Sequence, residues 1–190
     1  MSDCNIPHRA KVLVVGGGGR EHAIVDALSR SSRVEKIFCA PGNAGIARQA
    51  KCVPLGDTQV DELAEFAENE GIDLTVVGPE VSLAAGIVDE FESRGLKIFG
   101  PSKPAARIES SKDFAKSLMA KYDVPTAAYR TFSDYNEALA YLNAGKLPIV
   151  LKYDGLAAGK GVVVAETLEE ADAALKDMLL DDKFGHGRGV

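Results

Sequence analysis

The stretch that decides the fold is "KVLVVGGGGREHAIVDALSR", residues 11–30. Its valine- and leucine-rich start predicts a buried strand, its glycines predict a tight turn, and "REHAIVDALSR" predicts a helix. A strand that turns directly into a helix exposes backbone N–H groups at the helix N-terminus, and these favour a bound anion. The stretch therefore predicts the first βα unit of an α/β protein, with an anion site at its turn.

The same alternation continues through the first hundred residues. Further strands are predicted at 36–40, 74–78 and 97–100, and helical patterns follow at 60–71 and 82–94. Strands and helices in this order predict βαβ units, and hence a Rossmann-like parallel sheet with helices on both faces. Ligands of such sheets gather at the carboxyl ends of the strands, where three glycine-containing turns are expected to meet.

A second, smaller unit is predicted after residue 107. Pro101 and Pro104 mark a joint, and "SSKDFAKSLMAKYDVP" is typical of a capped helix. Two more helices are predicted from "SDYNEALAYLNAG" and "TLEEADAALKDMLL", and the last two strands of this unit are expected to form a hairpin around a glycine-rich loop. The predicted strands cover 127–132, 147–154 and 161–166.

Composition limits the classes of function. The 190 residues are 46% hydrophobic and carry a net charge of −6, so no basic field exists to hold a nucleic acid. No apolar run is long enough for a signal peptide or a membrane span, so a cytoplasmic location without a membrane partner is expected. Cys4, Cys39 and Cys52 lack metal-ligand spacing and are expected to be reduced.

The first glycine turn, in "VVGGGGREH", fits a dinucleotide site poorly. Gly16 and Gly18 match the first two glycines of the dinucleotide fingerprint, but Glu21 stands at the third position. A small phosphorylated ligand is therefore favoured, with Arg20 adding a charged donor to the backbone amides. The alternative is a tight turn whose Arg20 and His22 are merely solvated.

Two further turns, "APGNAG" (40–45) and "VGPE" (77–80), are expected at the same edge. Asn43 offers both a donor and an acceptor, and Glu80 could accept hydrogen bonds from sugar hydroxyls or an amine. Each turn is weak evidence by itself. Together with the first turn they predict one pocket for a sugar phosphate.

The loop in "KYDGLAAGKGVVVAE" (152–166) resembles a P-loop but does not have its spacing. Only three residues separate Gly155 from Gly159, and Gly161 stands where a P-loop has its metal-binding hydroxyl. A strand follows the loop where a P-loop requires a helix. We therefore interpret residues 154–161, called the flap below, as a hairpin loop that covers nucleotide phosphates.

Two lysines could supply positive charge to those phosphates. Lys152 ends an apolar run and needs an anionic partner, which is either a nucleotide phosphate or, in the alternative interpretation, Asp154. Lys160, in the flap, is a point charge suited to the β- or γ-phosphate.

Taken together, "GGGGREHA", "APGNAG", "VVGPEVSLAAGIVDE", "FGPSKPAARIESSKDFAK" and "VLKYDGLAAGKGVVVAE" closely resemble the N-terminal part of the phosphoribosylamine–glycine ligase family, also called glycinamide ribonucleotide synthetases. The resemblance runs from about Lys11 to the end of the chain. It implies a pre-ATP-grasp domain at 1–107, which binds phosphoribosylamine, and the start of an ATP-grasp domain at 108–190.

The resemblance also implies an activity. In this family of purine biosynthesis, ATP phosphorylates the carboxylate of glycine, and the amine of 5-phosphoribosylamine then attacks the acyl phosphate. The products are glycinamide ribonucleotide, ADP and phosphate. A carboxylate is a poor electrophile until phosphorylation supplies a leaving group, and a closed flap protects the intermediate from water.

Site residues follow from the resemblance, position by position, with no catalytic acid or base among them. The implied phosphoribosylamine-binding residues are Gly18, Gly19, Arg20, Glu21, Gly42, Asn43, Pro79 and Glu80. The implied ATP-binding residues are Lys112, Lys152, Asp154, Gly155, Leu156, Ala157, Ala158, Gly159, Lys160 and Gly161.

Family members continue beyond the point where this sequence stops, into a larger subdomain whose Glu and Asn hold Mg²⁺. Metal ligands are therefore expected beyond residue 190 and none within this chain, and the 190 residues by themselves are expected to be an inactive fragment. Two alternatives stay open. One is an ATP-grasp carboxylase that activates bicarbonate, and the other is a non-catalytic module that binds a phosphosugar or nucleotide.

Overall fold

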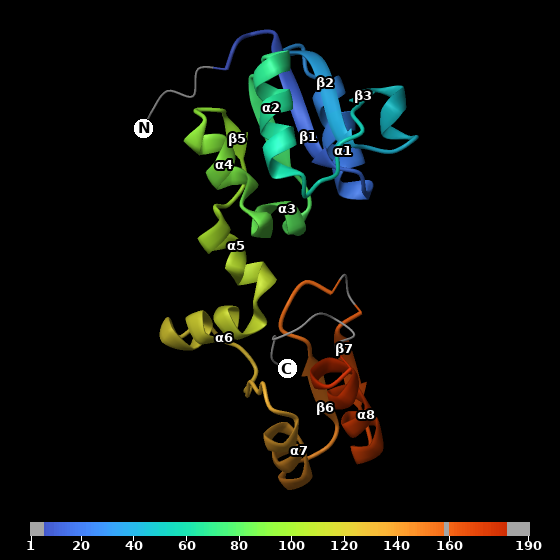
Figure 1. Cartoon of the computed structure of the whole chain (residues 1–190), viewed down its shortest axis with the longest axis vertical. Helices are drawn as coiled ribbons and strands as arrows, with labels where there is room; N and C mark the ends of the chain where they lie inside the picture. Colours follow the sequence, from blue (N-terminus) through green and yellow to red (C-terminus); the bar gives the residue numbers. More distant parts are fainter. Residues whose placement is uncertain (1–5, 158–159, 182–190) are drawn as a thin grey trace. The chain divides into compact units, whose positions relative to one another are not determined.

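The computed structural model describes residues 6–157 and 160–181. The chain divides into two compact units, Met1–Ala106 and Arg107–Val190 (Figure 1). Each unit has its own hydrophobic core.

The first unit contains a five-stranded parallel sheet in the order β3-β2-β1-β4-β5. This confirms the predicted parallel α/β fold. The two-residue strand β3 is not among the predicted strands, because a run as short as "KC" carries no periodicity. The strands are β1 Ala10–Gly16, β2 Val34–Pro41, β3 Lys51–Cys52, β4 Leu74–Val77 and β5 Ile98–Phe99.

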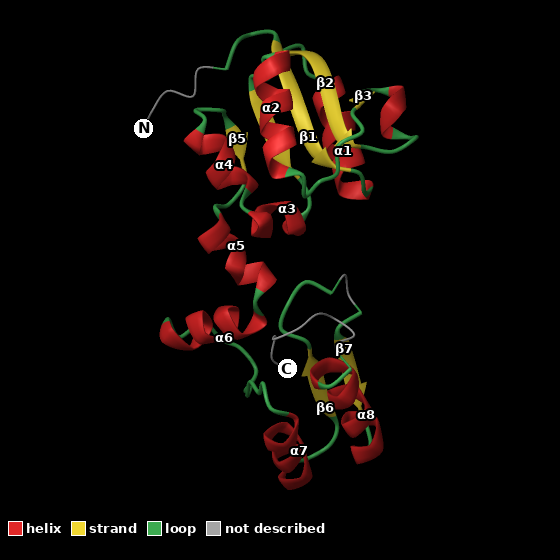
Figure 2. Ribbon diagram, in the orientation of Figure 1, coloured by secondary structure: helices red, strands yellow, loops and turns green. Residues whose placement is uncertain are grey.

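Helices cover both faces of this sheet, as predicted (Figure 2). Successive residues of β1 point to opposite faces, so Val14 packs with α1 (Gly19–Ser29) and the short helix η1 (Ile46–Arg48). Leu13 and Val15 pack on the other face, against α2 (Val60–Glu70) and α4 (Ile87–Ser93).

The helix predicted across 82–94 is instead two helices. Gly86 adopts a φ of +100° and ends α3 (Glu80–Ala85) just before α4 begins. A left-handed residue is a common helix terminator, and glycine adopts it without strain. Helix α3 begins just after β4, with Pro79 as its N-cap and Glu80 as its first residue. Helix α5 (Lys103–Ser110) follows β5.

The second unit is built on the predicted hairpin. Strands β6 (Ile149–Lys152) and β7 (Val162–Ala165) pair antiparallel, with Lys152 opposite Val162. One hairpin face packs into the core of this unit with side chains from two helices, α7 (Tyr135–Ala144) and α8 (Leu168–Leu179). The other predicted helix is α6 (Lys112–Lys121).

The prediction of a strand at 127–132 is wrong, because this segment is irregular. Side chains of α6 tie it down: Thr131 Oγ1 donates to Asp113 Oδ1 at 2.7 Å, and Lys116 Nζ donates to the Ala127 carbonyl at 3.1 Å. Its alternating pattern predicts a strand, but these long-range contacts to α6 decide its conformation.

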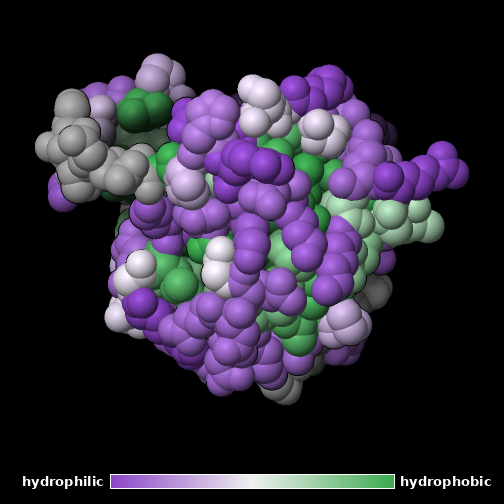
Figure 3. Space-filling view, turned by 90° about the horizontal axis from the view of Figure 1, so that it is seen from above, coloured by the Kyte–Doolittle hydropathy of each residue, from purple (hydrophilic) through white to green (hydrophobic). Residues whose placement is uncertain are grey.

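Hydrophilic residues predominate on the face shown in Figure 3, with smaller hydrophobic areas between them. Within the described part of the chain, no helix combines the length and apolar character that crossing a bilayer requires.

Candidate functional site

Arg20 joins the turn after β1 to the turn after β4. Its guanidinium donates to the Gly78 carbonyl at 2.7 Å and lies 3.4 Å from Glu80 Oε2. The interpretation of Arg20 as merely solvated is therefore wrong. An ion pair this exposed adds little stability, so its main effect is to hold a cation at the sheet edge.

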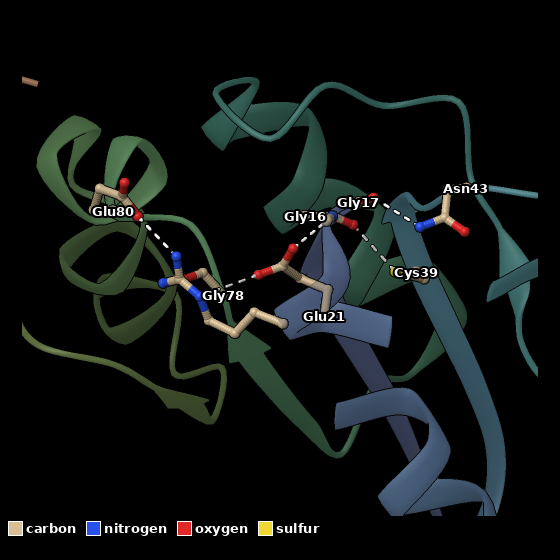
Figure 4. A network of polar contacts seen from close by, with 9 residues as sticks. Gly16, Gly17, Glu21, Cys39, Asn43, Gly78 and Glu80 are labelled. Carbon is tan, nitrogen blue, oxygen red and sulfur yellow. Dashed lines mark hydrogen bonds and ion pairs between the residues drawn. The ribbon is translucent and has the colours of Figure 1, made fainter. Parts of the chain in front are cut away.

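Glu21 is buried beneath this cation. Its Oε2 accepts a hydrogen bond of 2.6 Å from the Gly18 backbone N–H, and its Oε1 lies 4.0 Å from Arg20 Nε. Figure 4 shows the Glu21 carboxylate pointing toward the turn that contains Gly16 and Gly17. Glu21 stands in the first turn of α1, where the helix dipole favours negative charge. The Gly18 amide, one of the donors expected to face a ligand, is thus already occupied by a carboxylate of the chain.

Asn43 joins the turn after β2 to the turn after β1 (Figure 4). Its Nδ2 donates to the Gly17 carbonyl at 2.8 Å. Its Oδ1 accepts from the amides of Gly45 and Ile46, at 2.8 and 2.9 Å. Both ends of the side-chain amide therefore fix the backbone of the two turns.

The turn after β2 leaves no room for a side chain at residue 42. Gly42 has a φ of +71°, and a Cβ there would lie 2.5 Å from Cys52 Sγ. A Cβ at Gly17 would lie 2.6 Å from the Gly42 carbonyl oxygen. These glycines allow the two turns to approach closely. A Cβ at Gly19, by contrast, would have no atom of the described residues within 4 Å.

The three turns bring the implied phosphoribosylamine-binding residues to the carboxyl edge of one sheet. Those after β1 and β2 are joined through Asn43, and those after β1 and β4 through Arg20. Pro79 is the N-cap of α3. The set that the edge assembles is Gly18, Gly19, Arg20, Glu21, Gly42, Asn43, Pro79 and Glu80.

Cys39 supports the same edge from the core. Its Sγ donates to the Gly16 carbonyl at 3.2 Å, and burial raises the pKa of the thiol to about 12. Cys52 is half-buried, and both cysteines are free thiols.

This difference in burial predicts selective labelling. At pH 8 a thiol with a pKa of about 12 is thiolate in roughly one molecule in ten thousand, so Cys39 should resist iodoacetamide until the protein unfolds. Cys52 should react in the native protein. Mass spectrometry of tryptic peptides, with and without urea, measures both, and native labelling of Cys39 as fast as Cys52 would contradict the burial.

Lys152, at the end of β6, carries a charge that no described residue neutralises. Its side chain is exposed and has no hydrogen bond or ion pair to another residue that the structure describes. The interpretation in which Asp154 neutralises Lys152 is wrong. The Asp154 carboxylate instead accepts hydrogen bonds from Ser111 Oγ at 3.1 Å and from the backbone amides of Lys112 and Asp113 at the start of α6.

Lys112 is thereby held near the flap, and its Nζ donates to the Gly155 carbonyl at 2.9 Å. Lys112 and Lys152 line one cavity of about 310 Å³, together with Lys116 and Arg130, which the sequence patterns do not indicate. The carboxylates of Asp113 and Asp154 also line it, so the cations outnumber the anions. An excess of cations around an apolar wall suits an anion with an apolar body. The apolar lining includes Tyr129, Phe132, Ala138, Tyr141, Leu142, Ile149, Val150, Leu151 and Leu175.

The flap closes on itself at its base. The Tyr153 amide donates to the Gly161 carbonyl, and the Lys160 amide donates to the Ala157 carbonyl, both at 2.8 Å. Gly155 is buried, Leu156 and Ala157 are half-buried, and Lys160 is exposed. The flap residues Ala158 and Gly159 lie outside the described residues.

No group of three or more His, Cys, Asp or Glu side chains within residues 6–157 and 160–181 could hold a metal ion.

Known proteins share both parts of this arrangement. The sequence model described as "Phosphoribosylglycinamide synthetase, N domain" matches residues 10–109, and the one described as "Phosphoribosylglycinamide synthetase, ATP-grasp (A) domain" matches residues 110–190. The parallel sheet with its glycine turns, followed by a hairpin with a flap, defines a protein of the ATP-grasp class. The chain belongs to the phosphoribosylglycinamide synthetase family.

Curated relatives agree with this assignment. A phosphoribosylamine–glycine ligase of Neisseria meningitidis serogroup B is 57% identical over 176 residues, which are 93% of this chain and 42% of the relative. One from Caldanaerobacter subterraneus is 57% identical over 175 residues, 92% of this chain and 42% of the relative. The chain thus spans less than half the length of these relatives.

Solved structures share the fold. The phosphoribosylamine–glycine ligase of Thermotoga maritima superposes with a TM-score of 0.74 at 29% identity, over 94% of this chain and 42% of that one. An N5-carboxyaminoimidazole ribonucleotide synthetase solved with ADP has a TM-score of 0.71 at 18% identity, over 93% of this chain and 46% of that one, a likeness of fold only.

Proposed function

We propose that this chain supplies part of the substrate-binding machinery for ATP-dependent ligation of glycine to 5-phosphoribosylamine, with glycinamide ribonucleotide, ADP and phosphate as products. The observation that carries the proposal is the meeting of three family-matched turns at one sheet edge, joined by Arg20 and Asn43. The relatives' names supply the reaction. The ligands are small molecules, and the proposed location is the cytoplasm.

The sheet edge is the proposed phosphoribosylamine site. Arg20 offers a fixed guanidinium to the 5-phosphate, and the open backbone at Gly19 admits the phosphate to the N-terminus of α1. Glu80, on the far side of Arg20, can accept hydrogen bonds from a ribose hydroxyl or the amine. The Gly18 amide takes no part, because Glu21 occupies it.

The hairpin unit is the proposed site for the ATP phosphates. Lys152 is an exposed cation without a described partner, Lys112 is held against the flap, and Lys160 lies in the flap itself. These side chains neutralise phosphate charge and orient it, while the closed flap excludes water from the acyl phosphate. We assign no proton transfer to any of them.

Paired variants test the two sites together. In isothermal titration calorimetry on the 190-residue chain, Arg20→Ala should weaken binding of glycinamide ribonucleotide, the stable product, by about 10- to 100-fold and leave ATP binding unchanged. Lys152→Ala should weaken ATP binding and leave glycinamide ribonucleotide binding unchanged. Arg9→Ala and Lys146→Ala, exposed residues away from both sites, serve as matched controls.

Two results would contradict the proposal. One is the absence of glycinamide ribonucleotide binding to the unmodified chain, and the other is an equal loss of both ligands in each variant. The chain is also expected to bind without turnover. ADP formation that depends on both glycine and phosphoribosylamine would show that the 190 residues are catalytically sufficient.

A further inference from the structure

The Glu21 side chain fills a space that three glycines leave open. A Cβ at Gly78 would lie 2.0 Å from Glu21 Oε1 and 2.5 Å from its Cγ, and a Cβ at Gly16 would lie 2.7 Å from that Cγ. At Gly18 a Cβ would lie 2.9 Å from Oε2. Separations below 3 Å are closer than carbon and oxygen atoms pack. The turns after β1 and β4 therefore approach each other only as closely as this side chain permits.

Packing alone does not explain a carboxylate here, because a buried charge requires compensation. Glu21 is 4% exposed, and three groups compensate its negative charge: the Gly18 N–H at 2.6 Å, the N-terminus of α1, and Arg20 Nε at 4.0 Å. The contacts with the Gly18 N–H and with Arg20 also fix the geometry of the sheet edge. The hydrogen bond orients the Gly18 peptide, and the charge draws the base of the Arg20 guanidinium inward.

The same guanidinium then reaches across to the β4 turn. Its other nitrogens contact the Gly78 carbonyl at 2.7 Å and Glu80 at 3.4 Å, so the cation lies between two carboxylates and one carbonyl. The backbone that accepts from Arg20 at residue 78 is also the backbone that Glu21 packs against. One buried side chain thus sets both the separation of the two turns and the position of the cation that links them.

We infer that Glu21 is a positioning residue for the phosphosugar: it does not contact the ligand, and it acts by holding Arg20 and the Gly18 and Gly78 backbone in place. It also occupies the Gly18 amide, which directs an incoming phosphate to Arg20 and the more open backbone at Gly19. This inference rests on the proposed function of the sheet edge.

The first test is ligand-selective binding to the full 190-residue chain. Glu21→Gln keeps the size of the side chain and an acceptor for the Gly18 amide, but removes the charge that faces Arg20. It should weaken glycinamide ribonucleotide binding about tenfold, and Glu21→Ala by up to about 100-fold, while ATP binding is unchanged. Glu65→Gln, on the exposed face of α2, is the matched control.

The second test is a double-mutant cycle, which needs no ligand. Gly78→Ala should lower the urea midpoint of the first unit strongly, because its Cβ meets Glu21. In a Glu21→Ala background the same substitution should lower the midpoint much less, since the obstructing side chain is gone. Gly19→Ala, where no described atom lies near the new Cβ, should have little effect in either background.

The outcomes separate the two proposals. If the unmodified chain does not bind glycinamide ribonucleotide, the proposed function fails and this inference fails with it. If the unmodified chain binds and both Glu21 variants bind equally well, the inference is overturned and the proposed function stands. Additive effects of Gly78→Ala and Glu21→Ala would equally overturn it, whereas selective loss of binding with strong non-additivity supports it.

Discussion

Replacement of Asp154 by alanine is expected to destabilise the second unit by about 2–3 kcal/mol and to weaken ATP binding at the same time. The Asp154 carboxylate accepts from the Ser111 hydroxyl and from the backbone amides of Lys112 and Asp113. Hydrogen bonds to a charged group are stronger than neutral ones, and this one also benefits from the dipole of α6. Alanine removes all of these acceptors at once.

The effect on ATP follows from the same contacts. Asp154 fixes the start of α6 against the end of β6, and Lys112 in the first turn of α6 reaches the Gly155 carbonyl. Without the carboxylate, Lys112 loses its fixed position in the cavity that Lys152 also lines. The proposed phosphate site then contains two independent cations and no longer a preorganised pair.

Urea unfolding followed by hydrogen exchange of the second unit measures the stability change, and calorimetry measures ATP binding. Asp134→Ala is the matched control, because Asp134 also caps a helix of this unit, accepting from the Glu137 amide at 2.9 Å. It should cost about 1 kcal/mol and leave ATP affinity unchanged. If Asp154→Ala resembled Asp134→Ala in both measurements, the proposed coupling between α6 and the hairpin would be wrong.

The role of Asp154 could not be predicted from the sequence. Its partner Lys112 lies 42 positions earlier in the chain, and no local pattern joins a strand-end carboxylate to a distant helix start. The sequence predicts a capped helix in "SSKDFAKSLMAKYDVP", and the structure shows that Ser111 is the cap, with its hydroxyl accepting from the Phe114 amide at 3.2 Å. Local helix capping can be predicted from the sequence, whereas the Asp154 carboxylate reaches the start of α6 only in the folded structure.

The fold could be predicted where neighbouring residues determine the structure. Continuous valine-rich runs predict β1 and β4, and the helical pattern predicted at 60–71 corresponds to α2, which Gly71 ends in a left-handed conformation. The prediction fails at the segment 127–132, where side-chain contacts to α6 replace strand pairing. It also fails at Gly86, whose position within an apolar helical pattern gives no sign of a break.

The candidate site, too, could be predicted only in part from the sequence. The order of strands and glycine turns is enough to predict that Arg20 and Asn43 come to one edge. It is not enough to show that Glu21 turns inward and occupies the Gly18 amide. That orientation depends on the space at Gly78, which only the folded sheet creates.

Replacement of Phe38 by alanine is expected to have the largest effect on stability, about 3–5 kcal/mol, and only on the first unit. Phe38 is fully buried in β2 and contacts Phe66 edge-to-face, with ring centroids 5.3 Å apart. The ammonium groups of Lys36 and Lys51 lie 4.6 and 5.6 Å from the Phe38 ring centroid. Alanine would leave a cavity beneath the strand that carries the Asn43 turn.

The loss of stability is expected in one unit only, because each unit has a separate hydrophobic core. Phe38 belongs to a cluster whose members all lie in the first unit, and Leu175 belongs to a cluster confined to the second. Leu175→Ala should therefore cost about 2–5 kcal/mol in the second unit only. Hydrogen exchange resolved by peptide reports each unit separately, and an equal loss of protection in both units for either variant would show that the chain unfolds as one cooperative body. If the losses stay separate, Phe38→Ala should reduce glycinamide ribonucleotide binding while ATP binding persists, since each ligand then depends on the core beneath its own site.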